Sequence, residues 1–370
     1  MDSIVREVIT RAGEEPRVPE GPTQGAGGFA ADDAELERIL ASLRTNVKII
    51  GIGGGGTNTI DRLVEAGIIG AELYAANTDA QHLLTIRAPH KILLGRRVTR
   101  GLGAGALPQV GEEAAREAEE EIRAALQGAD MVFLTCGLGG GTGTGGAPYV
   151  AQLSKEMGAL TIAICTFPFR AEGAIRAENA EFGLEKLRNF ADTVIVIPND
   201  KLIELVPRLA LNAAFKVADD VLMRAIKGIT EVITKPGLVN LDFNDIKTIM
   251  KGGGVAMIGL GESDSERRAE ESIEEAINSP LIDVDISGAT GALINVTGGT
   301  DMTVSEAEKV AEVVQARISP NARIIWGAAI DPGLQHRLRV MLILTGVKSK
   351  QIYGPGETLR GHAAGVDVVR

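Results

Sequence analysis

The chain has 370 residues, 45% of them hydrophobic, and a formal net charge of −11 at pH 7. This length can bury a sizeable core, which we expect to be divided between two domains. The acidic balance argues against nucleic acid as a main partner, because binding phosphates requires a basic surface. No apolar run reaches the roughly 20 residues of a membrane span, and no signal-peptide pattern opens the chain. We therefore expect a cytoplasmic protein with no direct membrane insertion.

The cysteines, the histidines and a cluster of arginines do not predict a catalytic, metal-binding or nucleic-acid-binding site. Cys136 and Cys165 lie in apolar, strand-like runs, where cysteine acts as a small hydrophobe. The histidines are scattered without metal-ligand spacing, so the sequence predicts no protein-held metal and no Cys or His nucleophile. The basic cluster of Arg96, Arg97 and Arg100 is interpreted as a solvated edge.

Predicted helices and strands divide the chain into consecutive parts. Residues 1–45 are expected to form an N-terminal extension with a Gly- and Pro-rich linker and a short helix. Strands and helices alternate over residues 46–206, which predicts a doubly wound parallel sheet that binds a nucleotide. Residues 207–234 carry apolar side chains at 3–4 spacing and are predicted to form one long central helix. A second, smaller α/β domain is expected over residues 235–347, and a short tail over 348–370.

Strands are expected at 47–51, 72–76, 91–94, 130–136, 160–165 and 193–197, and in the second domain near 255–259, 292–296, 322–329 and 338–344, with helices near 264–278 and 303–317.

The first strand leads into a glycine-rich turn. Gly51, Gly53 and Gly56 satisfy the Gly-x-Gly-x-x-Gly pattern that binds dinucleotide phosphates ahead of a helix. Asp79 follows the next strand at about the distance expected of a ribose ligand. By itself this pattern is typical of an NAD(P)-dependent oxidoreductase, and that alternative is open at this point.

A longer glycine-rich turn follows the fourth predicted strand. Residues 137–146 hold seven glycines and two threonines, and Ala147-Pro148 opens a helical pattern. Such a turn exposes backbone N–H groups to an anion, with the helix dipole behind them. Thr142 and Thr144 can add hydroxyl donors. Since no Lys follows, this turn is not the Gly-x-x-x-x-Gly-Lys-Ser/Thr loop.

Two glycine turns at one edge of a parallel sheet can surround a single polyphosphate, because ligands bind at the carboxyl ends of the strands. The second turn therefore argues against the dinucleotide interpretation. A third glycine-rich stretch, residues 101–106, lies between them in the chain and can close over a terminal phosphate.

Phe215 and Asp219 are four residues apart on the long helix, hence on one face near its N-terminal end. An aromatic ring can stack on a purine, and a carboxylate can accept hydrogen bonds from N1–H and the 2-amino group of guanine. Adenine lacks both donors, so this pair would select GTP over ATP. The spacing alone equally allows a core Phe beside a surface Asp.

At this point a family resemblance can be stated. Residues 139–145, Gly-Gly-Gly-Thr-Gly-Thr-Gly, resemble the signature loop of the tubulin/FtsZ family of polymerising GTPases. The resemblance covers about residues 46–346 and is closer to the FtsZ branch, in its archaeal form, than to tubulin. Further matching motifs stand in the same order at 77–81, 101–111, 168–176, 197–201 and 236–245.

The resemblance implies a self-assembling GTPase that forms head-to-tail cytoskeletal filaments for cell division at mid-cell. It implies GTP or GDP as ligand, with Mg²⁺ held mainly through the phosphates, a homopolymer as the main partner, and a membrane-anchoring partner that the sequence does not identify. The GTP-binding residues it implies are Gly54, Gly55, Gly56, Thr57, Asn58, Asp79, Ala104, Gly105, Ala106, Gly140, Gly141, Thr142, Gly143, Thr144, Glu172, Arg176, Asn199, Phe215 and Asp219.

Within that set, Glu172 and Arg176 are four residues apart and equally suit an ordinary helical ion pair. In the family this Glu contacts ribose and this Arg reaches the phosphate side. If the ligand is GTP, Asp79 is better placed near the Mg²⁺–phosphate region than on ribose. Asn199 is implied as a further guanine contact.

Catalytic groups are expected in a different place. Asn240, Asp242 and Asp245 have the chemistry to orient a water, but they follow the far end of a helix about 40 Å long. Within one subunit they cannot reach the phosphates, whereas in a head-to-tail filament they would meet the GTP of the next subunit. The alternatives are that Asp242 and Asp245 are turn and helix-cap residues, or that the polymer binds GTP without turnover.

Two positions and the tail depart from the family pattern. Thr57 stands where a small Gly or Asn is usual, and Leu107 where Asn commonly precedes Pro108; both flank the expected phosphates. Residues 348–370 include no long linker and no acidic–hydrophobic peptide of the kind that docks FtsZ to membrane-anchoring partners.

Overall fold

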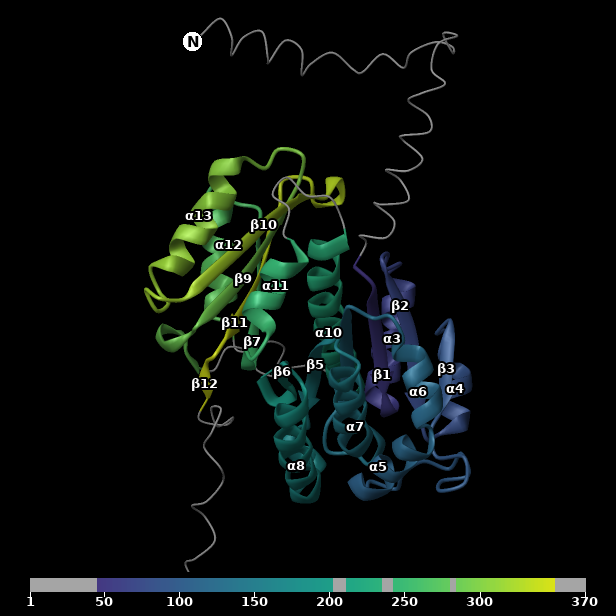
Figure 1. Cartoon of the computed structure of the whole chain (residues 1–370). Coiled ribbons are helices and arrows are strands. Elements are labelled where there is room, and N and C mark those ends of the chain that lie inside the picture. The colour runs from purple at the N-terminus through teal and green to yellow at the C-terminus, as the bar shows by residue number, and fades with distance from the viewer. Residues whose placement is uncertain (1–44, 202–210, 235–241, 280–283, 350–370) are drawn as a thin grey trace, which may run out of the picture. The chain divides into compact units, whose positions relative to one another are not determined.

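The computed structural model describes residues 45–201, 211–234, 242–279 and 284–349 (Figure 1). The predicted N-terminal extension up to residue 44, the predicted domain boundaries near 206 and 235, Asn240 and the tail beyond 349 lie outside the described residues. Within the described residues, no helix combines the length and apolar character needed to cross a membrane.

The first part of the chain alternates strands and helices as expected. Its strands are β1 (Val47–Ile52), β2 (Ala71–Asn77), β3 (His90–Leu93), β4 (Met131–Gly137), β5 (Leu160–Phe167) and β6 (Thr193–Pro198). Its helices are α3 (Gly53–Glu65), α4 (Ala80–Thr85), α5 (Pro108–Glu117), α6 (Glu119–Leu126), α7 (Thr142–Glu156), η1 (Arg170–Glu172) and α8 (Ala174–Phe190).

The second part begins with a long helix. Its helices are α10 (Leu211–Thr234), α11 (Phe243–Met250), α12 (Arg268–Ile277), η2 (Ile286–Gly288), α13 (Val304–Gln315) and η3 (Pro332–Leu334). Its strands are β7 (Gly254–Ser263), β8 (Val284–Asp285), β9 (Gly291–Gly298), β10 (Arg323–Ile330), β11 (Leu338–Thr345) and β12 (Lys348–Ser349).

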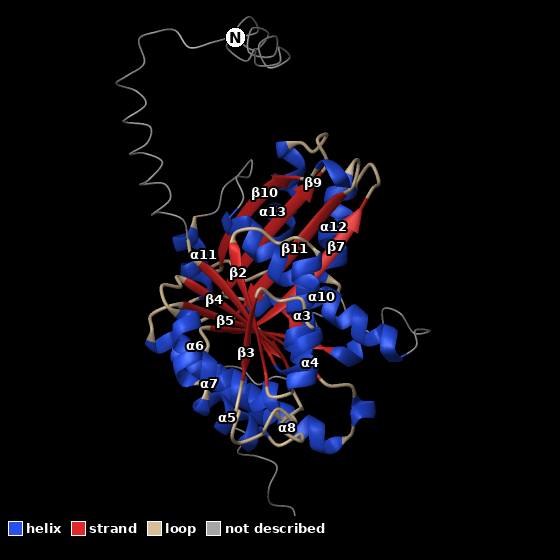
Figure 2. Cartoon of the chain, turned by 90° about the vertical axis from the view of Figure 1, so that its right-hand side faces the viewer, coloured by secondary structure: helices blue, strands red, loops and turns tan. Residues whose placement is uncertain are grey.

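One ten-stranded sheet runs through both parts, in the order β10-β9-β11-β7-β6-β5-β4-β1-β2-β3. Figure 2 draws the strands in red, with helices in blue around them. The strands from β1 to β6 pair in parallel, which is the doubly wound arrangement predicted from the sequence. The two parts join where β6 pairs with β7, with Thr193 opposite Gly254. Among the described strands of this sheet, β11 alone runs antiparallel, against both β7 and β9.

The apolar side chains form two clusters, one on each side of the sheet. The long helix α10 contributes buried side chains to one of these clusters, where they pack with residues of the strands. They are Ala218, Leu222, Ala225 and Ile229. Their 3–4 spacing places them on one stripe, as predicted. Because α10 also contacts α3, it connects the start of the chain's first α/β unit with the second part.

Two helices begin earlier than the sequence pattern indicated. Helix α7 starts at Thr142, so the second half of the glycine turn forms its first turn and Pro148 lies inside it. Helix α3 likewise starts at Gly53. Glycine has no side chain to report helical periodicity, so the pattern becomes visible only where larger residues begin. The acidic stretch 112–121 spans α5 and α6, which are separated at Ala118.

Candidate functional site

The two glycine turns lie against each other. Strands β1 and β4 are neighbours in the sheet, with Ile52 opposite Cys136, so α3 and α7 begin side by side. A Cβ atom on Gly53 would lie 2.8 Å from the backbone nitrogen of Gly143, and one on Gly56 would lie 2.2 Å from the carbonyl oxygen of Thr135. Only glycine allows the backbone to pack this closely.

Among the described residues, the N-termini of α3 and α7 have no capping side chain, and neither first turn contains an acidic residue. The first backbone N–H groups of a helix have no partner inside the helix, and the helix dipole adds partial positive charge there. Gly54 and Gly55 at the start of α3 are exposed, which leaves room for phosphate oxygens.

The third glycine-rich stretch, residues 101–106, contacts the end of β2 and the second glycine turn. Leu102 forms an antiparallel bridge with Asp79, and Ala80 N donates to Gly101 O at 3.0 Å. A Cβ atom on Gly141 would lie 2.7 Å from the Cβ of Ala104, so this stretch also contacts the second glycine turn. Gly105 and Ala106 are exposed, as is Leu107.

Asn179 on α8 joins these loops but was not singled out by sequence. Its amide nitrogen donates to the carbonyl oxygen of Ala106 at 3.1 Å and to that of Gly139 at 3.4 Å. No motif marks this residue, because its partners are backbone atoms far away in the chain. The three glycine stretches are thus held together at the carboxyl ends of the strands.

The predicted threonine hydroxyls hold the loops rather than pointing freely outward. Thr142 Oγ1 lies 2.6 Å from Thr78 Oγ1, and Thr144 Oγ1 accepts from Gly139 N at 2.9 Å. The Thr57 hydroxyl donates to the carbonyl oxygen of Gly53 at 2.9 Å. All three threonines are buried. The Thr57 hydroxyl is thus used inside α3, whereas the expectation that Thr142 and Thr144 add hydroxyl donors for phosphate stays a prediction.

At the other end of the site, Phe215 and Asp219 share one face of α10. The Phe215 ring is 39% exposed and packs edge-on against Phe169, with 5.1 Å between the ring centroids. The Asp219 carboxylate lies 3.5 Å from the guanidinium nitrogen Nε of Arg62 on α3. Burial raises the pKa of Asp219 to about 6, although the nearby Arg62 lowers it.

Two further predicted residues follow β5 and β6. The amide oxygen of Asn199 is buried and has no hydrogen-bond partner among the described residues, which is unusual for a buried polar atom. Glu172 accepts from the backbone nitrogen of Phe169 at 2.9 Å and pairs with Arg176 at 2.6 Å. The pair exists, but Glu172 belongs to η1 and Arg176 to α8, so it is not a pair within one helix.

The predicted catalytic carboxylates lie at the opposite edge of the sheet. Asp242 caps α11 by accepting from Asn244 N at 2.8 Å, and Asp245 is exposed in the first turn. The end of α11 adjoins the start of β6, where the Thr193 hydroxyl donates to Met250 O at 2.5 Å. The glycine turns follow the ends of the strands instead. The structure therefore does not bring the carboxylates and the glycine turns together within one chain.

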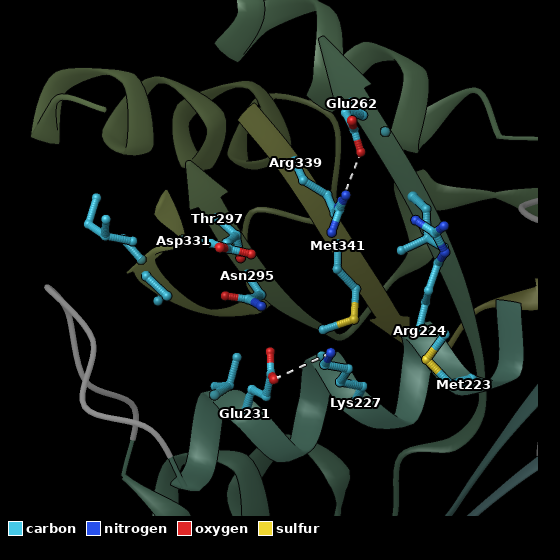
Figure 3. A pocket seen from close by; sticks show the side chains of 18 of the residues that line it. Met223, Arg224, Lys227, Glu231, Glu262, Asn295, Thr297, Asp331, Arg339 and Met341 are labelled. Atoms are coloured by element: carbon cyan, nitrogen blue, oxygen red, sulfur yellow. Dashed lines mark hydrogen bonds and ion pairs between the residues drawn. The ribbon is translucent and has the colours of Figure 1, made fainter. Parts of the chain in front are cut away.

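A cavity of about 650 Å³ lies elsewhere, between α10 and the strands of the second part (Figure 3). Its lining includes an ion pair between Arg339 and Glu262 at 2.8 Å, and Lys227 at 4.0 Å from Glu231. None of the residues predicted to bind nucleotide lines it. The described lining of this cavity contains no helix N-terminus of the two glycine turns, which is where the sequence predicts that phosphates bind.

The described residues contain no group of three or more His, Cys, Asp or Glu that could hold a metal ion. Asp79 caps α4 through one carboxylate oxygen, which accepts from His82 N at 3.0 Å, and it is partly exposed beside the glycine stretches. Oxygen donors of this kind suit Mg²⁺ that is carried mainly by phosphates.

Fold and site together define a nucleotide-binding α/β protein with paired glycine turns. Residues 46–207 match the family described as "Tubulin/FtsZ family, GTPase domain", and residues 254–348 match "FtsZ family, C-terminal domain". The chain belongs to the tubulin/FtsZ family and carries its GTPase domain, for which GTP and GDP are the ligands.

Curated relatives support the same assignment over the full length. The chain is 58% identical to "Cell division protein FtsZ 1" of Archaeoglobus fulgidus, over 100% of both chains. It is 57% identical to "Cell division protein FtsZ" of Haloferax mediterranei, covering 99% of this chain and 98% of the relative. A solved structure, "FtsZ dimer, empty (M. jannaschii)", superposes with a TM-score of 0.83 at 54% identity, covering 88% of this chain and 98% of that one.

These findings confirm the resemblance drawn from the motifs and the predicted fold class. The oxidoreductase alternative receives no support from them, since the Gly-x-Gly-x-x-Gly pattern belongs to a matched GTPase domain. The roles of individual site residues stay predictions.

Proposed function

We propose that this protein is a self-assembling GTPase that forms head-to-tail filaments in cell division. The A. fulgidus and H. mediterranei relatives are named as cell division proteins, and the M. jannaschii structure is described as a dimer. A head-to-tail contact uses two different surfaces of each subunit, so it repeats into an open filament instead of closing.

The phosphates of GTP bind at the N-termini of α3 and α7. Residues 54–58 and 140–144 form this part of the site, with the unpaired backbone N–H groups of the first turn of each helix as the donors, and residues 104–106 cover the terminal phosphate. Mg²⁺, when bound, neutralises phosphate charge, and Asp79 is the carboxylate that faces this end of the site. Arg176 lies toward the phosphates, and Glu172 toward the ribose.

Guanine binds at the α10 end of the same site. The exposed face of the Phe215 ring stacks on the base, and the Asp219 carboxylate accepts from N1–H and the 2-amino group. The buried amide oxygen of Asn199, unpaired among the described residues, supports its role as a further acceptor. A base without these donors would leave buried acceptors unpaired, which costs roughly 1–3 kcal/mol for each.

Hydrolysis uses carboxylates from the neighbouring subunit. The observation that carries this proposal is the position of Asp242 and Asp245 at the opposite edge of the sheet from the glycine turns. Helix α10 has 24 residues and is about 36 Å long, so no rearrangement of side chains brings the two together in one chain. Asp245, with Asn240 and Asp242, orients a water for attack on the terminal phosphate of the next subunit.

A concentration series tests the shared site. We expect the GTPase rate per molecule to rise steeply above a critical protein concentration and to coincide with the onset of light scattering. A specific activity that is constant from nanomolar to micromolar protein contradicts a site shared between subunits.

The proposal extends to the surroundings of the filament. We place it in the cytoplasm at the mid-cell division site, held to the membrane by an anchoring partner of unknown identity and without nucleic acid as partner. Fluorescence microscopy of a labelled chain in dividing cells tests this: a uniform signal through division contradicts it.

A further inference from the structure

His82 connects two segments that flank the proposed phosphate site. Its ring lies between Asn77, at the end of β2, and Asn58 on α3. Nδ1 is 3.2 Å from Asn77 Nδ2, and Nε2 is 3.1 Å from Asn58 Oδ1. The side chain is half-buried. Both ring nitrogens therefore have side-chain partners, one in each segment.

The direction of the hydrogen bonds is set by Asn77. Its amide oxygen accepts from the backbone nitrogen of Thr78 at 2.8 Å and from that of Asp79 at 3.4 Å. The amide nitrogen is consequently the atom that faces His82, and it donates to Nδ1. A neutral imidazole that accepts at Nδ1 carries its hydrogen on Nε2, so Nε2 donates to Asn58 Oδ1.

Thr57 does not change this direction. Its hydroxyl oxygen is 3.4 Å from His82 Nδ1 but only 2.9 Å from the carbonyl oxygen of Gly53. The single hydroxyl proton goes to the closer carbonyl acceptor. The Nδ1 atom of His82 thus stays an acceptor for Asn77.

These hydrogen bonds fix the orientation of the Asn58 side-chain amide. Since its amide oxygen is held by His82, its NH₂ group is turned to the other side, and in the described residues that nitrogen has no hydrogen-bond partner. Asn58 follows Gly54 by four residues and Gly55 by three, which places all three on one face of α3. Gly54 and Gly55 are exposed on that face.

We propose that His82 is a positioning residue for the nucleotide: it holds the Asn58 amide in the orientation that presents its N–H groups to the phosphates of GTP. This inference rests on the proposed function, which assigns Asn58 to the phosphate site. A donor that is oriented before binding loses less conformational freedom when the ligand arrives. The opposite amide orientation would present an oxygen to the phosphates and repel them.

His82→Leu removes both hydrogen bonds of the ring. We expect the Kd and KM for GTP to rise about three- to ten-fold, as for loss of one oriented hydrogen bond, with kcat at saturating GTP unchanged. His82→Gln keeps one acceptor and one donor on a planar group and should restore affinity to within about two-fold. His90→Leu is the matched control, because His90 stacks on Tyr74 outside this network; it should bind GTP as the parent does.

Asn58→Ala and the double variant with His82→Leu complete a cycle. If His82 acts through Asn58, the double variant binds GTP no worse than Asn58→Ala alone. Weak binding in Asn58→Ala together with unchanged binding in His82→Leu overturns the role of His82 and leaves the phosphate site intact. If Asn58→Ala binds GTP normally, the inference also fails, and Asp219→Ala then decides separately whether the proposed guanine site stands. Thermal unfolding without nucleotide identifies variants that have lost the fold.

Discussion

The side chain of Arg62 on α3 lies 3.5 Å from that of Asp219 on α10, measured from Nε to Oδ2. Helix α3 begins at the first glycine turn, so this ion pair connects the proposed guanine end of the site to the helix that faces the proposed phosphate end. The two side chains are 27% and 17% exposed, and at that burial desolvation opposes the attraction between the charges. If Asp219 binds guanine as proposed, recognition of the base depends on the ionisation of this carboxyl group.

GTP affinity should depend on pH through Asp219. Burial raises the pKa of this carboxyl to about 6, so the protonated form persists to higher pH than for a solvated Asp. Only the ionised form accepts from both guanine donors. We expect affinity to fall as pH drops through about 6 and to be constant at higher pH, as measured by equilibrium binding.

Two variants control this experiment. Asp219→Asn cannot titrate and should show a flat profile over the same range. Arg62→Ala removes the group that lowers the pKa, so its loss of affinity should begin at higher pH. A parent and an Asp219→Asn variant with the same pH profile would show that another group controls binding.

Base selectivity should narrow in Asp219→Ala. Two hydrogen bonds to the guanine edge are lost, so we expect GTP to bind roughly 10-fold to 100-fold more weakly while ATP binding changes little. Asp220→Ala is the matched control, because Asp220 is the next residue on α10 and pairs with Arg224 at 2.7 Å. Equal effects of the two substitutions would rule out a specific role for Asp219.

Much of the fold follows from the sequence because side-chain periodicity reports it. The buried stripe of α10, with Leu222 and Ile229, has the spacing of a helix and was predicted. The starts of α3 and α7 were not, because Gly53 and its neighbours have no side chain to carry a pattern. The two parts join into one sheet where Thr193 pairs with Gly254. This pairing could not be predicted, because the two residues are far apart in the sequence and no local pattern indicates it.

In the candidate site, too, some features could be predicted from the sequence and others could not. The glycine turns are recognisable because their backbone conformation needs a particular residue type. Arg62, His82 and Asn179 were missed, since each is an ordinary residue whose role arises from partners brought close by folding. Thr144 also holds the second glycine turn, because its hydroxyl oxygen accepts from Gly139 N, and no local pattern predicts that contact.

Two glycines of α3 should separate stability from binding. A Cβ atom on Gly56 would lie 2.2 Å from Thr135 O, so Gly56→Ala should push α3 from β4 and destabilise the fold by about 1–3 kcal/mol. A Cβ atom on Gly54 meets nothing within 4 Å, so Gly54→Ala should stabilise the helix by about 0.5–1 kcal/mol. The added methyl group would nevertheless stand at the proposed phosphate site.

Thermal unfolding without nucleotide and GTP binding check both halves of this prediction. We expect Gly54→Ala to unfold at a higher temperature and to bind GTP more weakly than the parent. If Gly54→Ala bound GTP normally, the phosphate would not approach the start of α3.

Asp245→Ala should separate binding from turnover. Asp245 is exposed at the start of α11, at the edge of the sheet away from the glycine turns, so its loss should leave folding and GTP binding intact. Filaments should still form, while hydrolysis falls by about two orders of magnitude or more for want of an oriented water. Filaments of the variant should outlast those of the parent, followed by light scattering after a limited addition of GTP.

Mixing two defective variants tests whether the carboxylate acts in trans. A side chain at Gly141 would come within 2.7 Å of the Cβ of Ala104 and 2.9 Å of Leu107 N, so Gly141→Ser should displace the loop over the phosphates and impair GTP binding. That variant keeps its own Asp245. In mixed filaments, the Asp245 of one protein can face the GTP of an Asp245→Ala subunit, so GTPase activity should return. Mixtures that demonstrably co-assemble and remain inactive would place the catalytic water under the control of residues within a single subunit.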